Sequence, residues 1–128
     1  MSRLHGYTIL IVDDDLDILE SMELAMRAEG ATTITAENGT DAVSVAASSE
    51  PDAVILDMML PKRSGFLVLE ELQNMQSPPI VIMVTANEGR RHMAYAKSLG
   101  VASYLIKPVG LDRLIDTVSC LLQKDSEQ

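Results

Sequence analysis

The sequence predicts an α/β protein in which a doubly wound, five-stranded parallel sheet is covered by five helices. Five short apolar runs of strand length occur along the 128 residues, and most are continuous rather than alternating, as in strands buried on both faces. The segments between them carry apolar residues every three or four positions, as on one face of a helix. A strand followed by a helix recurs about every 25 residues, which leaves room only for short connections. The five units share no sequence, so this spacing does not indicate a solenoid.

The strands are expected at 7–12, 32–36, 53–56, 80–84 and 103–106. The helix after the first strand is marked most clearly, because its apolar stripe stops at Gly30, a residue typical of helix ends. That stripe consists of Leu16, Leu19, Met22 and Met26.

Four further stripes predict the remaining helices. They are Ala42, Val43 and Ala46; Leu67, Val68 and Leu72; Met93, Ala94 and Leu99, ending at Gly100; and Leu111, Leu114, Ile115, Val118, Leu121 and Leu122. The last helix should run from Leu111 to about Gln123. We therefore expect one domain over residues 1–128, with a core at 7–123 and a polar tail at 124–128.

The composition of the chain argues against several classes of function. Ten Lys and Arg residues against nineteen Asp and Glu give a net charge of -9, which opposes direct binding to nucleic acid or to an anionic membrane. No apolar run approaches the roughly eighteen residues of a membrane span, and the N-terminus lacks a signal-peptide stretch. Cys120 is the only cysteine, so it forms no internal disulfide and is expected to be a structural thiol. These features favour a cytoplasmic protein that binds a cation.

Polar residues follow the strands at the edge of the sheet where ligands bind in doubly wound folds. The first run is followed by Asp13, Asp14 and Asp15, the third by Asp57, the fourth by Thr85 and the fifth by Lys107. Carboxylates forced together repel unless a cation lies among them. Oxygen ligands without His or Cys favour Mg²⁺, Mn²⁺ or Ca²⁺ over Zn²⁺, and a few carboxylates with water suit octahedral Mg²⁺ best.

Asp57 stands apart from the other acids and needs its own explanation. A carboxylate can attack phosphorus and form an acyl phosphate, provided that a metal and a fixed cation neutralise the phosphoryl oxygens. Lys107 and the Thr85 hydroxyl are suited to the remaining contacts.

Four motifs occur at the ends of successive strands: Ile-Leu-Ile-Val-Asp13-Asp14-Asp15, Val-Ile-Leu-Asp57-Met-Met-Leu-Pro61, Met-Val-Thr85-Ala86 and Tyr104-Leu-Ile-Lys107-Pro108. Each is weak alone, but the four in this order are specific. Together they resemble the response-regulator receiver domain of two-component signal transduction, as in chemotaxis regulators, over essentially the whole chain. The resemblance implies a flavodoxin-like fold with strand order 2-1-3-4-5.

The resemblance also implies a role for each matching residue. Asp57 would accept the phosphoryl group, and Lys107 would contact it. Mg²⁺ would be held by Asp13, Asp14, Asp57 and the backbone carbonyl of Met59. Thr85 and Tyr104 would be the switch pair, Pro61 and Gly65 match the loop after the acceptor, and the Lys107–Pro108 peptide would be cis.

A receiver of this kind is a signalling protein and not an enzyme beyond its own phosphorylation and slow autodephosphorylation. The implied donor is a phosphohistidine on a sensor histidine kinase or histidine phosphotransfer protein. The implied recipients of the signal are a downstream protein target or effector domain, reached through the face of the fourth helix, fifth strand and fifth helix. The resemblance also implies that a second copy of the chain is a partner, in a dimer that forms on phosphorylation.

The chain departs from the family pattern in two places. Leu60 stands where Met is usual, and Val109 stands where Phe is commoner. Both changes affect packing and remove no chemical group from the site. Asp15 is an additional acid, and we expect it to start the first helix because acids favour helix N-termini.

Other functions fit parts of the pattern. Phosphatases of the haloacid dehalogenase type also combine an Asp nucleophile, Mg²⁺, Thr and Lys, but they need a second Asp two residues on, where this chain has Met59. A phosphate-independent interaction module would not require the full set of acids, Thr and Lys. An EF-hand loop beginning at Asp13 fails because Ile18 and Leu24 occupy the positions of its Gly and Glu.

Overall fold

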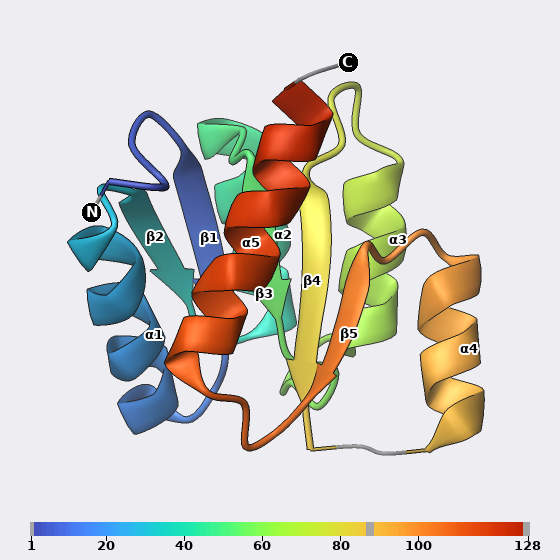
Figure 1. Cartoon of the computed structure of the whole chain (residues 1–128). Coiled ribbons are helices and arrows are strands. Elements are labelled where there is room, and N and C mark those ends of the chain that lie inside the picture. Colours follow the sequence, from blue (N-terminus) through green and yellow to red (C-terminus); the bar gives the residue numbers. More distant parts are fainter. Residues whose placement is uncertain (1, 87–88, 127–128) are drawn as a thin grey trace.

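The computed structural model describes residues 2–86 and 89–126, and it contains a five-stranded parallel sheet between two layers of helices (Figure 1). The strands are β1 (Thr8–Val12), β2 (Thr32–Ala36), β3 (Ala53–Leu56), β4 (Ile80–Thr85) and β5 (Ser103–Ile106). The helices are α1 (Leu16–Ala28), α2 (Gly39–Ser49), α3 (Gly65–Gln73), α4 (Arg90–Ser98) and α5 (Leu111–Ser126). The sheet order is β2-β1-β3-β4-β5. The predicted fold class and strand order are both confirmed.

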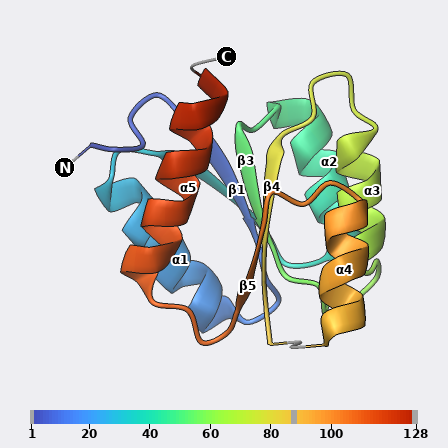
Figure 2. The ribbon, with the colours of Figure 1, turned by 45° about the vertical axis from the view of Figure 1, so that its right-hand side comes forward.

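Helices α1 and α5 cover one face of the sheet, and α2, α3 and α4 cover the other (Figure 2). Side chains of β1 alternate between the two sides: Ile9 and Ile11 belong to the core cluster under α1 and α5, whereas Leu10 and Val12 belong to the cluster under α2 and α3. Successive strand residues point to opposite faces. Because both faces are covered, the strand sequences are continuously apolar.

The helix ends differ from the predicted stripes. Leu16 and Leu111 are 58% and 40% exposed, because each is the first residue of its helix and lies beyond the end of the strands. On α4 the buried residue is Ala96 rather than Ala94, and Ala96 belongs to the core cluster on the α2 and α3 side of the sheet. Gly30 and Gly100 follow α1 and α4 with positive φ values of 94° and 96°, which confirms the predicted helix ends.

The prediction for Cys120 is wrong, because its side chain is exposed. The buried face of α5 includes Val118 and Leu122. Cys120 is two residues from each, and a helix turns about 100° per residue. Its side chain therefore points away from the core.

Within the described residues, the packed and helical parts extend further toward both ends than predicted. Leu4 is fully buried, and its N–H donates to the Glu29 carbonyl at 2.9 Å, so the core begins before residue 7. Helix α5 continues to Ser126, which makes part of the predicted polar tail helical, and 127–128 lie outside the described residues. Within the described ranges, no helix is long and apolar enough to cross a membrane.

Candidate functional site

The register of the sheet brings the polar strand ends to one edge. Val12 pairs with Leu56, and Thr85 pairs with Ile106. The residues that follow β1 and β3 are therefore neighbours, and the residue that follows β5 lies at the same edge of the sheet, beyond β4. Figure 1 shows these strand ends converging at the edge from which α1 and α4 start.

The Lys107 ammonium group links the acids of β1 and β3. Its Nζ atom donates to Asp13 Oδ2 at 2.7 Å and to Asp57 Oδ2 at 2.9 Å. Asp13 and Asp57 are only 2% and 6% exposed. Buried carboxylates need hydrogen bonds and a compensating charge, and Lys107 supplies both.

Backbone N–H groups hold the other oxygen of each buried carboxylate. The Asp15 N–H donates to Asp13 Oδ1 at 2.9 Å, and the Met59 N–H donates to Asp57 Oδ1 at 3.0 Å. The Asp15 side chain in turn accepts from Asp17 N and Ile18 N at the start of α1. Asp15 is thus the helix N-cap, as predicted, and its backbone fixes the orientation of Asp13.

The same edge can hold a divalent cation. Asp13, Asp14 and Asp57 each place a carboxylate oxygen within 4.8 Å of the other two, and Asp14 is exposed. This all-oxygen donor set, with an open side, has the chemistry of a Mg²⁺ site that keeps several waters. Lys107 contributes one positive charge beside three negative ones, so the site retains excess negative charge for a metal.

Charge and burial shift two pKa values at the site. Burial lowers the pKa of Lys107, but the hydrogen bonds to Asp13 and Asp57 and the charges of these carboxylates outweigh that effect, and the pKa is raised overall. The amine therefore stays charged at neutral pH. Burial raises the pKa of Tyr104, and the negative charge of Asp57 raises it further. Both effects disfavour ionisation of the Tyr104 hydroxyl.

The two predicted switch residues lie at different depths. Thr85 ends β4 and is completely buried, and its carbonyl accepts from the Lys107 N–H at 2.8 Å. Tyr104 lies on β5, is half-buried, and approaches the sulfur of Met58 with its hydroxyl at 4.0 Å. Met58 directly follows Asp57, so Tyr104 contacts the segment next to the buried carboxylate.

The structure therefore groups Asp13, Asp14, Asp57 and Lys107 in one cluster. The Met59 side chain is 63% exposed, but its backbone N–H is bonded to Asp57. The Lys107–Pro108 peptide is cis, as the resemblance implied.

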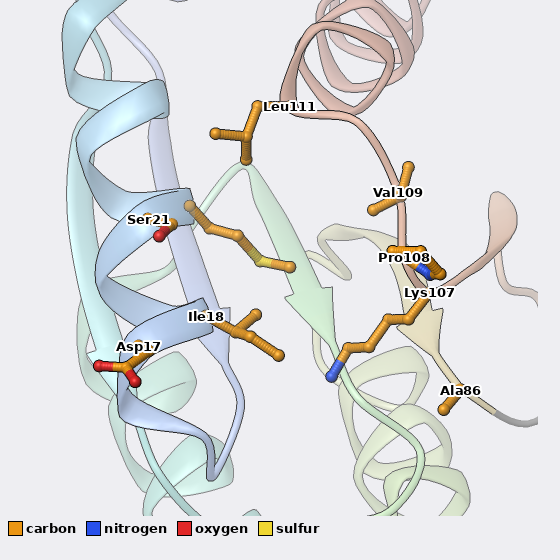
Figure 3. Close-up of a pocket in the computed structure, with 9 residues that line it drawn as sticks. Asp17, Ile18, Ser21, Ala86, Lys107, Pro108, Val109 and Leu111 are labelled. Atoms are coloured by element: carbon orange, nitrogen blue, oxygen red, sulfur yellow. The ribbon is translucent and has the colours of Figure 1, made fainter.

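A cavity of about 590 Å³ beside Lys107 did not emerge from the sequence. It lies between α1 and the β5–α5 connection, and the Lys107 side chain extends along it toward the ends of the strands (Figure 3). Its lining includes Ile18, Met22 and Val109. The larger Phe that is commoner at position 109 would fill part of it, so only the departure at Val109 signalled this space.

Comparisons with known proteins agree on one family. Residues 9–119 match the family described as the response regulator receiver domain. The response regulator MprA of Mycobacterium sp. (strain KMS) is 30% identical over 118 residues, which cover 92% of this chain and 51% of that protein. The transcriptional regulatory protein PrrA of Mycobacterium tuberculosis is 33% identical over 116 residues, covering 91% and 50%. The chain thus spans about half the length of these curated relatives.

A solved structure supports the same grouping. The response regulator receiver domain protein (CheY-like) of Methanospirillum hungatei JF-1 superposes with a TM-score of 0.91 at 25% sequence identity. The match covers 97% of this chain and 98% of that one. The agreement therefore extends over the whole sheet and both helical layers.

Proposed function

The chain belongs to the response regulator receiver family, and on that basis we propose that Asp57 is the residue that takes the phosphoryl group. Phosphoacceptor function is that of the family, and the comparisons do not favour the haloacid dehalogenase alternative. The observation that supports Asp57 is its pairing with Lys107, with a carboxylate oxygen of both Asp13 and Asp14 within 4.8 Å of its own.

The chemistry would begin at the Asp57 carboxylate. One of its oxygens attacks phosphorus, the O–P bond forms, and the P–N bond of a phosphohistidine donor breaks with the imidazole as leaving group. The Met59 N–H holds Asp57 Oδ1 at 3.0 Å, which orients the carboxylate. Lys107 lies within reach of Asp57 Oδ2 at 2.9 Å and is placed to exchange this contact for a phosphoryl oxygen as negative charge develops.

The acids and one backbone carbonyl fit the metal that such a transfer needs. Asp13, Asp14, Asp57 and the Met59 carbonyl would hold Mg²⁺, which when bound neutralises phosphoryl oxygens. The Asp13 carboxylate pairs with Lys107 through Oδ2, so the Lys107 ammonium and the metal would both contact this carboxylate. Reorientation of the ammonium toward Asp57 would accompany occupation of the site.

The output of the domain would be a changed binding surface. Thr85 and Tyr104 would report the charge at Asp57 to α4, β5 and α5, and the raised pKa of Tyr104 supports an electrostatic link to Asp57. The donor would be a histidine kinase or histidine phosphotransfer protein in the cytoplasm, and the recipient a protein target or effector domain. In this proposal the chain catalyses only its own phosphorylation and its own slow dephosphorylation.

Phosphorylation by a small donor tests the role of Asp57. Incubation with acetyl phosphate and Mg²⁺ should add one phosphoryl group by intact-mass spectrometry, and EDTA should prevent it. Asp57→Asn should stay unlabelled, whereas the matched control Asp112→Asn, at an exposed position on α5, should be labelled like wild type. Equal labelling of Asp57→Asn would show that another residue accepts the phosphoryl group.

A further inference from the structure

We propose that Gly39, the first residue of α2, is a positioning residue for the phosphoryl and metal site. Gly39 would hold the loop at 58–64 in its position against α2. This loop follows Asp57 and contains Met59. The inference rests on the proposed function, because that function gives the Met59 backbone its role. Gly39 itself lies outside the four motifs of the site.

The loop lies directly on the α-carbon of Gly39. A methyl group added at this position would lie 2.3 Å from the Arg63 carbonyl oxygen and 2.6 Å from Arg63 Cβ. The first of these contacts involves backbone, so rotation of a side chain cannot relieve it. Any residue larger than glycine at position 39 must therefore move the loop or the start of α2.

A hydrogen bond joins the same two segments. The Gly39 N–H donates to the Pro61 carbonyl at 3.3 Å. N–H groups in the first turn of a helix have no partner within the helix, and here the loop provides one. The Asn38 side chain caps a different N–H, that of Asp41, at 2.9 Å, so the Gly39 N–H is left to the loop.

The other side of the loop is fastened to α3. The Gly65 N–H donates to the Met58 carbonyl at 2.9 Å, and Arg63 forms an ion pair with Glu71 at 2.6 Å. Between these attachments, Lys62 has a φ of 69°, a conformation that a non-glycine residue keeps only when its surroundings hold it there. Contacts on both sides therefore determine the path of the loop.

Met59 lies between the fastened points. Its N–H orients Asp57 Oδ1, and its carbonyl is a proposed metal ligand. A shift of the loop at Arg63 and Pro61 would pass to Met59 through a few residues of backbone. Gly39 would thus act on the site through the loop without touching it.

Gly39→Ala should weaken Mg²⁺ binding. Groups that orient metal ligands typically change metal affinity 10- to 100-fold when mutated, so we expect the Mg²⁺ dissociation constant to rise at least about tenfold. The amide resonance of Met59 should also shift in the metal-free protein. Mg²⁺ binding is measured by titration of the full chain followed by NMR.

Two controls separate positioning from general destabilisation. Gly110→Ala makes the same chemical change at a position with nothing within 4 Å of the added methyl group, and it should bind Mg²⁺ like wild type. Leu122→Ala removes a buried side chain of the cluster under α5, on the opposite face of the sheet from Gly39. It should lower the unfolding midpoint and leave the Mg²⁺ dissociation constant unchanged.

A measurement on wild type keeps the proposal testable if Gly39→Ala does not fold. Coupling between two sites is reciprocal, so Mg²⁺ should slow hydrogen exchange of the Gly39 amide as well as that of Met59. The proposal is overturned if Gly39→Ala keeps the wild-type Mg²⁺ affinity, or if Mg²⁺ protects Met59 and leaves Gly39 unchanged. Failure of wild type to bind Mg²⁺ or to accept phosphoryl from acetyl phosphate would instead contradict the proposed function.

Discussion

Asp14→Asn should stabilise the metal-free protein, although it removes a proposed metal ligand. The carboxylate oxygens of Asp13, Asp14 and Asp57 lie within 4.8 Å of one another. Three carboxylates and the Lys107 ammonium leave two negative charges at the site. In the unfolded chain position 57 is far from positions 13 and 14, so folding brings repelling charges together.

The size of the effect follows from how Lys107 is placed. In the structure Lys107 neutralises part of the repulsion, because it bonds to both Asp13 and Asp57. Asp14 then experiences roughly one uncompensated negative charge. At about 4.8 Å in a water-like dielectric this repulsion is about 1 kcal/mol, and the exposed position of Asp14 justifies that dielectric.

Urea unfolding in EDTA and in Mg²⁺ at matched ionic strength measures the effect. In EDTA, Asp14→Asn should have a free energy of unfolding about 1 kcal/mol above wild type. With Mg²⁺ at ten times its dissociation constant, wild type should gain about 1.4 kcal/mol and the variant much less, so the order should reverse. Asp15→Asn removes the same charge at the adjacent position and retains a good N-cap residue. Mg²⁺ should therefore raise its free energy of unfolding as much as that of wild type.

Two results would contradict this expectation. Asp14→Asn could be less stable than wild type in EDTA, which would mean that repulsion among the acids does not destabilise the metal-free protein. Alternatively, Mg²⁺ could stabilise Asp14→Asn and wild type equally, which would mean that Asp14 is not part of a shared metal site.

Four further predictions concern Lys107, Tyr104 and Thr85. Lys107→Met should lower the free energy of unfolding in EDTA by about 3 kcal/mol, because it leaves two buried carboxylates without their cation. This is the low end for breaking a buried ion pair, because the Lys107 side chain is partly exposed; unchanged urea midpoints would contradict this. The pKa of Lys107 is raised in the folded protein, so the stabilisation that the charged amine provides is complete below its ordinary pKa of 10.5. This stabilisation is lost as the pH rises through the folded-state pKa. In urea melts at pH values above 10.5, wild type should therefore lose more stability than Lys107→Met. Asp57→Asn should lower the pKa of Tyr104 toward its ordinary value while burial keeps part of the rise, as followed by ¹³C NMR of the tyrosine ring; an unchanged pKa would show that the charge of Asp57 does not reach Tyr104. Thr85→Ala should still accept phosphoryl from acetyl phosphate but should reduce the accompanying shift of the Tyr104 resonances, and a full wild-type shift would remove Thr85 from the switch.

Local sequence patterns predicted the strands closely because both faces of the sheet are covered. Strands β2, β3 and β5 have the predicted bounds, and β1 and β4 differ by one residue. The helices were predicted less well at their ends, since periodicity cannot show where a helix extends beyond the sheet. Leu16 and Leu111 fit their stripes and are nevertheless exposed.

The site was predictable as a set of residues but not as a set of contacts. The position of each polar residue after its strand predicts that Asp13, Asp57 and Lys107 meet. The sequence does not show that Lys107 bonds to both acids in the metal-free protein, because that depends on side-chain geometry. The approach of Gly39 to Arg63 is likewise a contact between segments distant in sequence, and no local pattern signals it.

The role of Asp57 is tested most directly by locating the phosphoryl group on the chain. After reaction with acetyl phosphate and Mg²⁺, borohydride reduction converts an acyl phosphate on an aspartate into homoserine, which peptide mass spectrometry can assign to a position. We expect homoserine at position 57 in the wild-type chain and its absence when EDTA replaces Mg²⁺. Homoserine at position 13 or 14 with Asp57 unmodified would contradict the assignment of Asp57 as the phosphoacceptor.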